Sequence, residues 1–369
     1  MNTVVILPTY NERDNIRILL DGIVDVWCKI FGHTLTIVVV DDTSPDGTAD
    51  VVRQYQKKHP NVLLLTGKKE GLGSALLRGM TYALDALHAE IIVQMDADLS
   101  HDPASLPLFM AAINKGADFA VGSRYIKGGS IPDNWGIHRK LFSIVGNAIV
   151  RFGLGYTNVH DWTGGYRAYK ESFARDSRRE LSKYQGYVFQ IAYLHKSIKR
   201  GAGIAEVPIH FTDRKFGHSK IAPSQYIRDV LRYVIGERVK DIFSGSFGKF
   251  LVVGSIGFII NTLVLELMVR LGFHPALGSG VGAEFAIVSN FLLNNAWTFG
   301  SRRVKGIRAV GKFFQFNMTS VGAILIQAGT VWLGTFLFGV TTYRWFYIVG
   351  VGIGLVWNYT MYSKVIWKK

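Results

Sequence analysis

Two aspartates, Asp96 and Asp98, stand one residue apart directly after an apolar run in the segment EIIVQMDADLSH. Carboxylates at positions i and i+2 beyond a buried strand can both approach one hard cation, because such cations prefer oxygen ligands. A divalent ion held with open positions binds the phosphate oxygens of a nucleotide and offsets the charge on a departing diphosphate. A solvated turn is the alternative interpretation of a lone D-x-D.

Further polar residues follow other apolar runs. Asp42 ends a run in VVVDDTSPDGT, where a carboxylate can accept hydrogen bonds from a nucleobase or a ribose, whereas Asp46 fits a turn and a helix N-cap. Arg124 stands at a strand end, where a guanidinium can bind phosphate oxygens in pairs. Asp161, in DWTGG, either orients an acceptor or a metal or is a buried cap.

The elements that must position these residues alternate along the N-terminal half. Short β-branched runs at 4–7, 35–40, 62–65, 91–94 and 119–122 predict strands, and helical patterns such as 15–30 and 48–58 lie between them. This alternation predicts a mostly parallel, doubly wound α/β sheet, whose ligands bind at the carboxyl ends of the strands. Neither a P-loop nor a dinucleotide-binding domain is supported, because GxxxxGK[ST] and GxGxxG are both absent.

Composition separates a soluble part from a membrane part. The chain has 369 residues, a net charge of +15, 49% hydrophobic residues and one cysteine, Cys28. This excludes a disordered basic protein, a disulfide framework and a cysteine-based zinc site. Residues 247–369 carry eleven Lys and Arg against two acids, Glu266 and Glu284. A stretch that is both basic and apolar is typical of a membrane domain, so we expect the bilayer, and no nucleic acid, as a partner.

Four apolar segments, at about 250–271, 276–298, 313–338 and 345–366, are each long enough to span a hydrocarbon core of about 30 Å. The joint 300–312 carries five positive charges, and three more follow Met361. The positive-inside rule therefore predicts a multi-pass protein whose N-terminal domain and both termini are cytoplasmic. The first strand begins within a few residues of Met1, so no secretory signal is expected. Glu266 and Arg270, four residues apart in the first span, are expected to pair.

Between the two parts, residues 225–243 alternate apolar positions with basic ones at helical spacing. This predicts an interfacial amphipathic helix. The expected division is an α/β domain at 1–223, the amphipathic linker at 224–246 and the membrane domain at 247–369. Residues 135–152 show a similar apolar spacing and either meet the bilayer or pack on the soluble core.

Several motifs carry a family resemblance in one consistent order: LPTYNERDNI, VVVDDTSPDGT, GLGSALLRGM, QMDADLSHDP, GSRYIKGG, DWTGGYRAYK, GYVFQ and EVPIHFTDRKFGHSK. Over roughly residues 1–230 the chain resembles family-2 inverting glycosyltransferases of the GT-A fold, most closely the dolichol-phosphate mannose synthases, which are polyprenyl-phosphate mannosyltransferases. The C-terminal third resembles the GtrA-like four-helix transmembrane domain that accompanies some of them.

The resemblance implies transfer of mannose from GDP-mannose to dolichyl (polyprenyl) phosphate with inversion, giving dolichyl phosphate mannose and GDP at the cytoplasmic membrane face. It implies that Asp96, Asp98 and Ser100 hold Mg²⁺ or Mn²⁺, although some relatives have the longer Gln at the position of Ser100. It implies a catalytic set and two binding sets. The catalytic set is Asp96, Asp98, Arg124 and Asp161; the donor would contact Pro8, Tyr10, Glu12, Val40, Asp42, Asp96, Ala97 and Asp98; the acceptor phosphate would contact Arg124, Arg139, Ser143, Arg214 and Lys220.

Two alternatives stay open from the sequence. One keeps the chemistry and changes the donor to UDP-glucose. The other is a translocator, in which the four spans move a lipid-linked sugar across the bilayer and the soluble domain regulates them.

Overall fold

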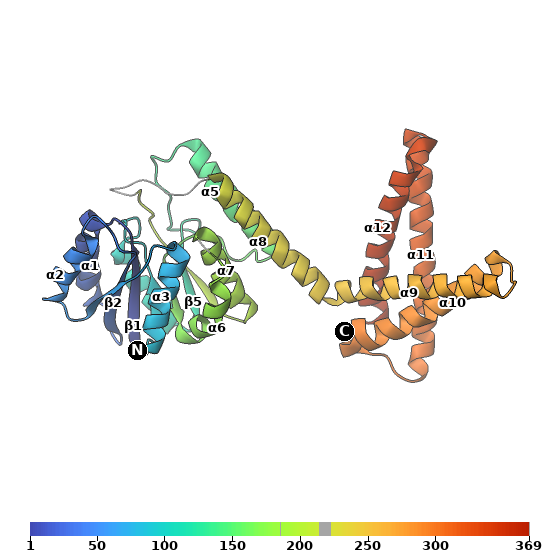
Figure 1. Ribbon diagram of the computed structural model, residues 1–369, viewed down its shortest axis with the longest axis horizontal. Coiled ribbons are helices and arrows are strands. Elements are labelled where there is room, and N and C mark those ends of the chain that lie inside the picture. Colours follow the sequence, from blue (N-terminus) through green and yellow to red (C-terminus); the bar gives the residue numbers. More distant parts are fainter. Residues whose placement is uncertain (185, 214–222, 369) are drawn as a thin grey trace. The chain divides into compact units, whose positions relative to one another are not determined.

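The structure is a computed structural model that describes residues 1–184, 186–213 and 223–368. The chain divides into two compact units, Met1–Arg238 and Val239–Lys369. Figure 1 shows the sheet within the first unit and long helices in the second. The division falls inside helix α8 (Pro223–Ser244), so the two units are described separately.

The first unit is built on a seven-stranded sheet with the order β3-β2-β1-β4-β6-β5-β7. Neighbouring strands pair in parallel except β6, which runs antiparallel to both β4 and β5. This confirms the mostly parallel sheet and all five expected strands, and it adds two short ones that the sequence did not predict, β6 and β7. The strands are β1 (Asn2–Thr9), β2 (Thr34–Asp41), β3 (Val62–Thr66), β4 (Ile91–Gln94), β5 (Phe119–Ser123), β6 (Arg167–Lys170) and β7 (Ile204–Pro208).

Helices cover both faces of this sheet (Figure 1). In β1, Val4 and Ile6 pack into one apolar core while Val5 and Leu7 pack into the other, because successive side chains of a strand point to opposite faces. One core includes residues of α1 (Arg13–Trp27), α2 (Thr48–Gln56) and α4 (Leu106–Asn114). The other includes residues of α3 (Leu72–Asp85), α5 (Ile137–Leu154), α6 (Glu171–Leu181), α7 (Gly186–Lys199) and α8.

The second unit is helical, as expected, and contains four long helices: α9 (Ser246–Arg270), α10 (Pro275–Leu293), α11 (Ile307–Phe338) and α12 (Tyr343–Met361). Helix α9 packs against α10, and α11 packs against α12. Among the described residues, α9 and α11 are each long and apolar enough to cross a membrane. The expected pair in α9 is confirmed, since Arg270 Nε lies 3.3 Å from Glu266 Oε1 and both side chains are exposed.

Helix α11 begins at Ile307, six residues before the expected position 313, because the left-handed Gly306 (φ 61°) ends the preceding loop. Arg308 and Lys312, expected in the joint, therefore lie in the first turns of α11. The α10 and α12 segments each end in a short π-helical stretch, Asn294–Thr298 and Tyr362–Ile366.

These two stretches meet in an aromatic cluster at one end of the second unit. The Phe299 and Trp367 rings stack with centroids 4.7 Å apart. Asn295 ties the cluster together: its Oδ1 accepts from Trp367 Nε1 (2.9 Å) and Val304 N (2.8 Å), and its Nδ2 donates to the Val304 carbonyl (2.9 Å). Arg302 donates to the Trp367 carbonyl at 3.0 Å. The basic loop and the end of the chain are thereby held at the same end of the unit.

We expect Asn295→Ala to destabilise the second unit by about 2 kcal/mol, because it leaves buried hydrogen-bonding groups without partners. Thermal unfolding of the full chain in detergent measures this as a lower Tm. Ser255→Ala is the control, since Ser255 is exposed and its hydroxyl donates within its own helix, to the Leu251 carbonyl at 3.1 Å. An equal effect of the two substitutions would contradict the role given to Asn295.

Candidate active site

The polar residues expected to do chemistry lie at one edge of the sheet. Strands β1, β2 and β4 run parallel to one another. Strand β5 runs in the same direction, because β6, which lies between β4 and β5, is antiparallel to both. Tyr10, Asp42, Asp96 and Arg124 follow the ends of β1, β2, β4 and β5 within two residues. The carboxyl edge of the sheet therefore brings these side chains to one region, as in other open α/β sheets.

The Asp96–Asp98 segment forms a tight turn. Asp98 is 5% exposed, and its Oδ1 accepts from the Ser100 backbone N–H (3.1 Å) and from the Ser100 hydroxyl (2.6 Å). Leu99 between them has a left-handed φ of 64°, which Ser100 and Asp98 together maintain. The Asp96 side chain is more accessible, with 34% of its surface exposed. Ala97 is buried.

His101 fixes the start of this turn. Its Nδ1 accepts the Asp96 backbone N–H at 3.0 Å, and its ring stacks on Tyr166 with centroids 5.1 Å apart. Gly165 faces the Asp96 carboxylate, and a Cβ at that position would lie 3.1 Å from Asp96 Oδ1. A side chain at position 165 would press on the Asp96 carboxylate, so a glycine is needed there. Carboxylate oxygens that remain partly exposed, as in Asp96, suit a hard divalent cation. Within the described ranges no three His, Cys, Asp or Glu residues group as metal ligands.

The two adjacent aspartates at the end of β2, Asp41 and Asp42, have different surroundings. Asp41 has no exposed surface, and it accepts hydrogen bonds from the Thr9 hydroxyl (3.0 Å) and from the Ser44 hydroxyl (2.6 Å) and backbone N–H (2.8 Å). It therefore connects β1 to the turn after β2. Asp46 accepts from the Thr48 backbone N–H at 3.0 Å and the Thr48 hydroxyl at 2.6 Å, so it lies in the expected turn, but the N-cap of α2 is Gly47 and not Asp46.

Asp42 lies beside a cation that the sequence did not single out. Its Oδ1 accepts a hydrogen bond from Nη2 of Arg78, which comes from α3. Burial raises the pKa of the Asp42 carboxyl above its usual 3.8, although Arg78 opposes the shift. A second cation lies at the end of β1, where Lys69 Nζ is 3.6 Å from the centre of the Tyr10 ring.

The other residues expected at the donor differ in accessibility. Val40 is fully buried in the core, so only its backbone can meet a ligand. Pro8 is half-buried at the end of β1. Glu12 precedes α1, where its Oε2 accepts from Asn15 Nδ2 at 2.7 Å and its backbone N–H donates to Thr48 Oγ1 at 3.0 Å.

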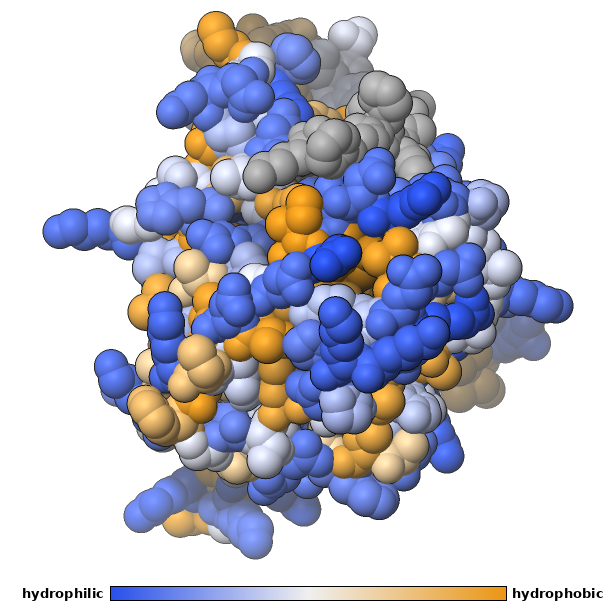
Figure 2. Space-filling view, turned by 90° about the vertical axis from the view of Figure 1, so that its left-hand side faces the viewer, coloured by the Kyte–Doolittle hydropathy of each residue, from blue (hydrophilic) through white to orange (hydrophobic). Residues whose placement is uncertain are grey.

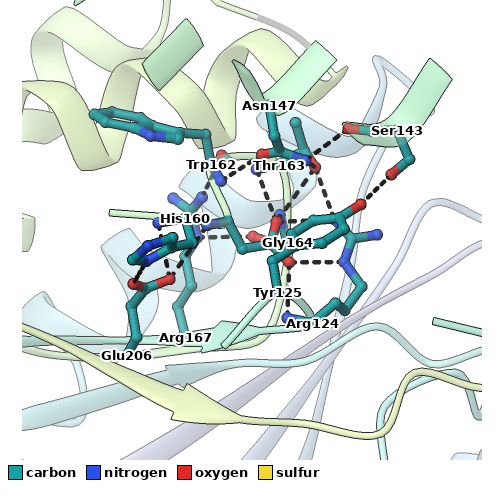
Figure 3. A network of polar contacts seen from close by, with 11 residues as sticks. Arg124, Tyr125, Ser143, Asn147, His160, Trp162, Thr163, Gly164, Arg167 and Glu206 are labelled. Atoms are coloured by element: carbon teal, nitrogen blue, oxygen red, sulfur yellow. Dashed lines mark hydrogen bonds and ion pairs between the residues drawn. The ribbon is translucent and has the colours of Figure 1, made fainter. Parts of the chain in front are cut away.

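Arg124 is held by a buried ion pair. Its Nε and Nη2 donate to the two oxygens of Asp161 at 2.7 and 2.8 Å, and Nη2 also donates to Thr163 Oγ1 at 2.8 Å (Figure 3). Asp161 has no exposed surface. Burial alone would raise the pKa of Asp161, but the charge and hydrogen bonds of Arg124 outweigh burial and lower that pKa. The ionised carboxylate therefore sets the orientation of the guanidinium.

The loop 160–165 that carries Asp161 is pinned from two further strands. Arg167 of β6 is fully buried and donates to the carbonyls of Gly164 (2.9 Å), Trp162 (3.0 Å) and Gln190 (2.6 Å). Its desolvation lowers the pKa of the Arg167 guanidinium to about 10. Glu206 of β7 accepts from His160 Nδ1 at 2.7 Å and from the Asp161 backbone N–H at 3.2 Å (Figure 3).

Helix α5 contributes two more of the expected residues. The Ser143 hydroxyl lies 2.5 Å from the Tyr125 hydroxyl, and Asn147 one turn later accepts the Trp162 backbone N–H at 2.7 Å (Figure 3). Arg139 lies 3.2 Å from Asp213 and 4.0 Å from the centre of the Trp135 ring. Arg214 and Lys220 lie outside the described residues.

Three residues of this region were missed by sequence reasoning: Arg78, His101 and Arg167. Arg78 and Arg167 resemble ordinary solvated charges, because their partners are distant in the sequence. His101 stands inside the motif DADLSHDP, so its proximity to the aspartates was the one available signal.

The face shown in Figure 2, which includes the side of α1 and α2 seen at the left of Figure 1, is covered mainly by hydrophilic side chains with apolar ones among them. Such a surface is typical of a domain in contact with water.

We expect Asp161→Asn to destabilise the chain by about 3 kcal/mol at pH 7, because it leaves the Arg124 charge buried without its counter-ion. Denaturant unfolding in detergent measures this loss. Since the folded-state pKa is lowered, the contribution of Asp161 is complete above its usual pKa of 3.8 and disappears as the pH falls through the folded value. The difference between wild type and variant should therefore be constant from pH 7 to about pH 5 and narrow below pH 4.

Asp50→Asn is the matched control, because Asp50 also pairs with an arginine, Arg53, but both side chains are more than half exposed. We expect a loss of at most about 1 kcal/mol there. A difference for Asp161→Asn that keeps its full size at pH 3 would refute the assignment.

Two family models match the chain. Residues 4–178 match the glycosyl transferase family 2, and residues 249–367 match the GtrA/DPMS transmembrane domain. The chain is therefore a glycosyltransferase that carries a membrane domain.

Curated relatives agree with both matches. The chain is 31% identical to a dolichol-phosphate mannosyltransferase from Pyrococcus furiosus, over 100% of this chain and 99% of the relative. It is 38% identical to a polyprenol monophosphomannose synthase from Mycolicibacterium smegmatis, over 62% of this chain and 84% of the relative. An undecaprenyl-phosphate mannosyltransferase from Micrococcus luteus is 36% identical over 60% of this chain and 88% of the relative. Because the first of these matches runs the length of both chains, this chain belongs to the family of dolichol-phosphate mannosyltransferases, with a family-2 glycosyltransferase domain and a GtrA/DPMS transmembrane domain.

Proposed function

We propose that the chain transfers mannose from GDP-mannose to dolichyl phosphate or another polyprenyl phosphate, with inversion at the anomeric carbon. The observation that carries the proposal is the meeting of two sites at one sheet edge: the Asp96–Asp98 turn on one side and Arg124 on the other. Loop 160–165 contributes to both, through Gly165 beside Asp96 and Asp161 beneath Arg124.

A divalent ion, Mg²⁺ or Mn²⁺, would be held by Asp96 and Asp98, and it would supply positive charge to the donor diphosphate. Ser100 donates its proton to Asp98 and keeps lone pairs that can face the ion. The Asp96 side chain is 34% exposed and is accessible to such an ion.

The reaction is a single displacement. A phosphate oxygen of the acceptor forms a bond to the anomeric carbon while the bond from that carbon to the donor phosphate breaks and GDP leaves with the electron pair. The acceptor oxygen is already an anion, so no side chain needs to remove a proton from it. Positioning of the two phosphates carries the catalysis. Arg124 contacts the acceptor phosphate, Arg139, Ser143, Arg214 and Lys220 assist it, and Asp161 acts through Arg124 as a positioning residue.

The nucleotide occupies the β1–β2 side of the edge. Tyr10, Asp42, Glu12, Pro8 and the Val40 backbone surround the guanosine. Ala97 and the two flanking aspartates then meet the diphosphate. This order places the anomeric carbon between the Asp96–Asp98 turn and Arg124.

Membrane attachment follows from the lipid acceptor. In α5, Ile137, Leu141 and Val145 are 78, 56 and 51% exposed at successive turns. In α8, Val230 and Val234 are buried while Ile227 and Ile235 are 40 and 58% exposed. Helices α5 and α8 lie together, since Gly153 of α5 packs against Val234 of α8. A long exposed apolar face with basic neighbours is suited to a bilayer surface. We propose that these faces rest on the cytoplasmic leaflet.

The second unit completes the topology. We propose four membrane crossings by α9 to α12, with the catalytic domain and both termini in the cytoplasm. The clustering of Arg302, Lys312 and the chain end at one end of the unit supports this orientation, because Lys312 Nζ lies 3.0 Å from the Val365 carbonyl.

Donor competition with purified protein tests the reaction. We expect radiolabelled mannose to pass from GDP-mannose to polyprenyl phosphate, and unlabelled UDP-glucose not to compete. Asp98→Asn and addition of a chelator should each lower kcat at least 100-fold, since both remove the charge that stabilises the leaving diphosphate. Asp102→Asn is the control, because Asp102 caps the short turn Pro103–Ser105 outside the aspartate pair. Turnover of UDP-glucose alone, or full activity with chelator, would overturn the proposal.

The membrane contact of α5 is tested by Leu141→Ser with Val145→Ser. Both side chains are more than half exposed, so we expect an unchanged Tm. Activity on long-chain acceptor in vesicles should fall several-fold, while activity on a short, water-soluble acceptor should stay at the wild-type level. Equal activity of variant and wild type on both acceptors would exclude this role for α5.

A further inference from the structure

Arg78 has a geometry that the roles above do not explain. It stands on α3 beside Gly79, whose lack of a side chain lets the helix approach Ile6 and Val40 in the sheet. From there one end of its guanidinium, Nη2, bonds Asp42 Oδ1. Its Nε is buried and has no hydrogen-bond partner within the residues that the structure describes. The Arg78 side chain is 23% exposed and that of Asp42 is 7% exposed. An ion pair that is this deeply buried, and in which the Nε donor has no partner among the described residues, is poorly explained as a surface ion pair.

The backbone around Arg78 is shaped to accommodate the guanidinium. A Cβ at Gly67 would collide with the guanidinium carbon and nitrogens of Arg78, so a glycine is needed there. Gly67 is itself fixed, because its N–H donates to the Asp41 carbonyl (3.0 Å) and its carbonyl accepts from the Thr43 hydroxyl (2.7 Å). The guanidinium therefore lies across a rigid loop next to the end of β2, where the base of a donor nucleotide would sit.

A carboxylate beside a guanidinium complements one base better than the others. Along one edge, guanine presents a carbonyl acceptor, O6, next to two donors, N1–H and the 2-amino group. Uracil offers a single N–H between two carbonyls. Adenine presents an amino donor where guanine has its carbonyl and a ring acceptor where guanine has N1–H. Its amino group would therefore face the Arg78 donors, and its ring nitrogen would face the Asp42 carboxylate. Paired contacts of this kind discriminate between bases by about 1–3 kcal/mol.

We propose that Arg78 and Asp42 together read the base of the donor nucleotide, Arg78 donating to O6 of guanine and Asp42 accepting from N1–H and the 2-amino group. This inference rests on the proposed GDP-mannose donor and adds Arg78 as its specificity-determining residue. Arg78 needs no contact with the sugar or the reacting atoms, so its loss should change nucleotide choice more than the rate of transfer.

Titration calorimetry of the purified full-length chain with GDP, inosine diphosphate and UDP, all with Mn²⁺, tests the inference. Wild type should bind GDP most tightly, and inosine diphosphate, which lacks the 2-amino group, several-fold more weakly. Arg78→Ala should weaken the binding of GDP by about 10–100-fold and the binding of UDP by less than about threefold, since the lost contacts are those specific to guanine. The kcat with saturating GDP-mannose should stay within about threefold of wild type.

Two variants guard against a general loss of folding. Arg78→Lys keeps a charge beside Asp42 but not the planar fork, so we expect a Tm near that of wild type and the same loss of GDP preference. Arg53→Ala removes an arginine from an exposed pair with Asp50 and should leave the affinities for GDP and for UDP unchanged.

The outcomes separate this inference from the proposed function. A wild-type preference for UDP would overturn the GDP donor and the inference with it. The inference alone would be overturned if wild type prefers GDP and both Arg78 variants keep that preference. It would also be overturned if the Arg78 variants lose affinity for GDP and for UDP to the same extent.

Discussion

The catalytic unit depends on a set of charges that are buried in its interior. Asp161, on the loop 160–165, pairs with Arg124, and Arg167 holds the same loop through the carbonyls of Trp162 and Gly164 and bonds a third carbonyl, that of Gln190 in α7. Removing charges from water costs several kcal/mol for each ion unless every polar atom finds a partner. The loop is consequently confined to one conformation. Any displacement of the loop would separate Asp161 from Arg124 and leave both buried charges without their partner.

This confinement links the two halves of the site. Within the same short loop, a Cβ at Gly164 would lie 3.1 Å from the Gly122 carbonyl of β5, and one at Gly165 would lie 3.1 Å from Asp96. The loop therefore packs between the strand end that carries Arg124 and the turn that carries Asp96 and Asp98. A rigid element in contact with both groups fixes their separation. Fixed separation is what an in-line displacement between two bound phosphates requires.

The sequence predicted the parts of this arrangement that depend on neighbours in the chain. The five buried strands appear as apolar runs, and the turn residues after them mark the binding edge, so Asp42, Asp96, Asp98 and Arg124 could be selected without a structure. Strand β6 was not predicted, because it begins and ends with charged residues, and one of them, Arg167, is stable there only with carbonyls up to 23 residues away. The pairing of Arg78 with Asp42 bridges 36 residues, and nothing local distinguishes Arg78 from a solvated helix charge.

The absence of any need for a general base explains why the buried acid is tolerated. A carboxyl that had to accept a proton in catalysis would need a pKa near the working pH, and burial beside a cation produces the opposite shift, as it does in Asp161. An acceptor that arrives as an anion removes this requirement, and the carboxylate can be used entirely for orientation. The same anion is attached to a chain that stays in the bilayer, so the phosphate must be met at the membrane surface. Exposed apolar side chains on α5, the helix that also carries Arg139 and Ser143, would bring the site to that surface. Orientation by buried charge and the proposed delivery by an apolar face would thus both follow from one substrate, a phosphate on a lipid.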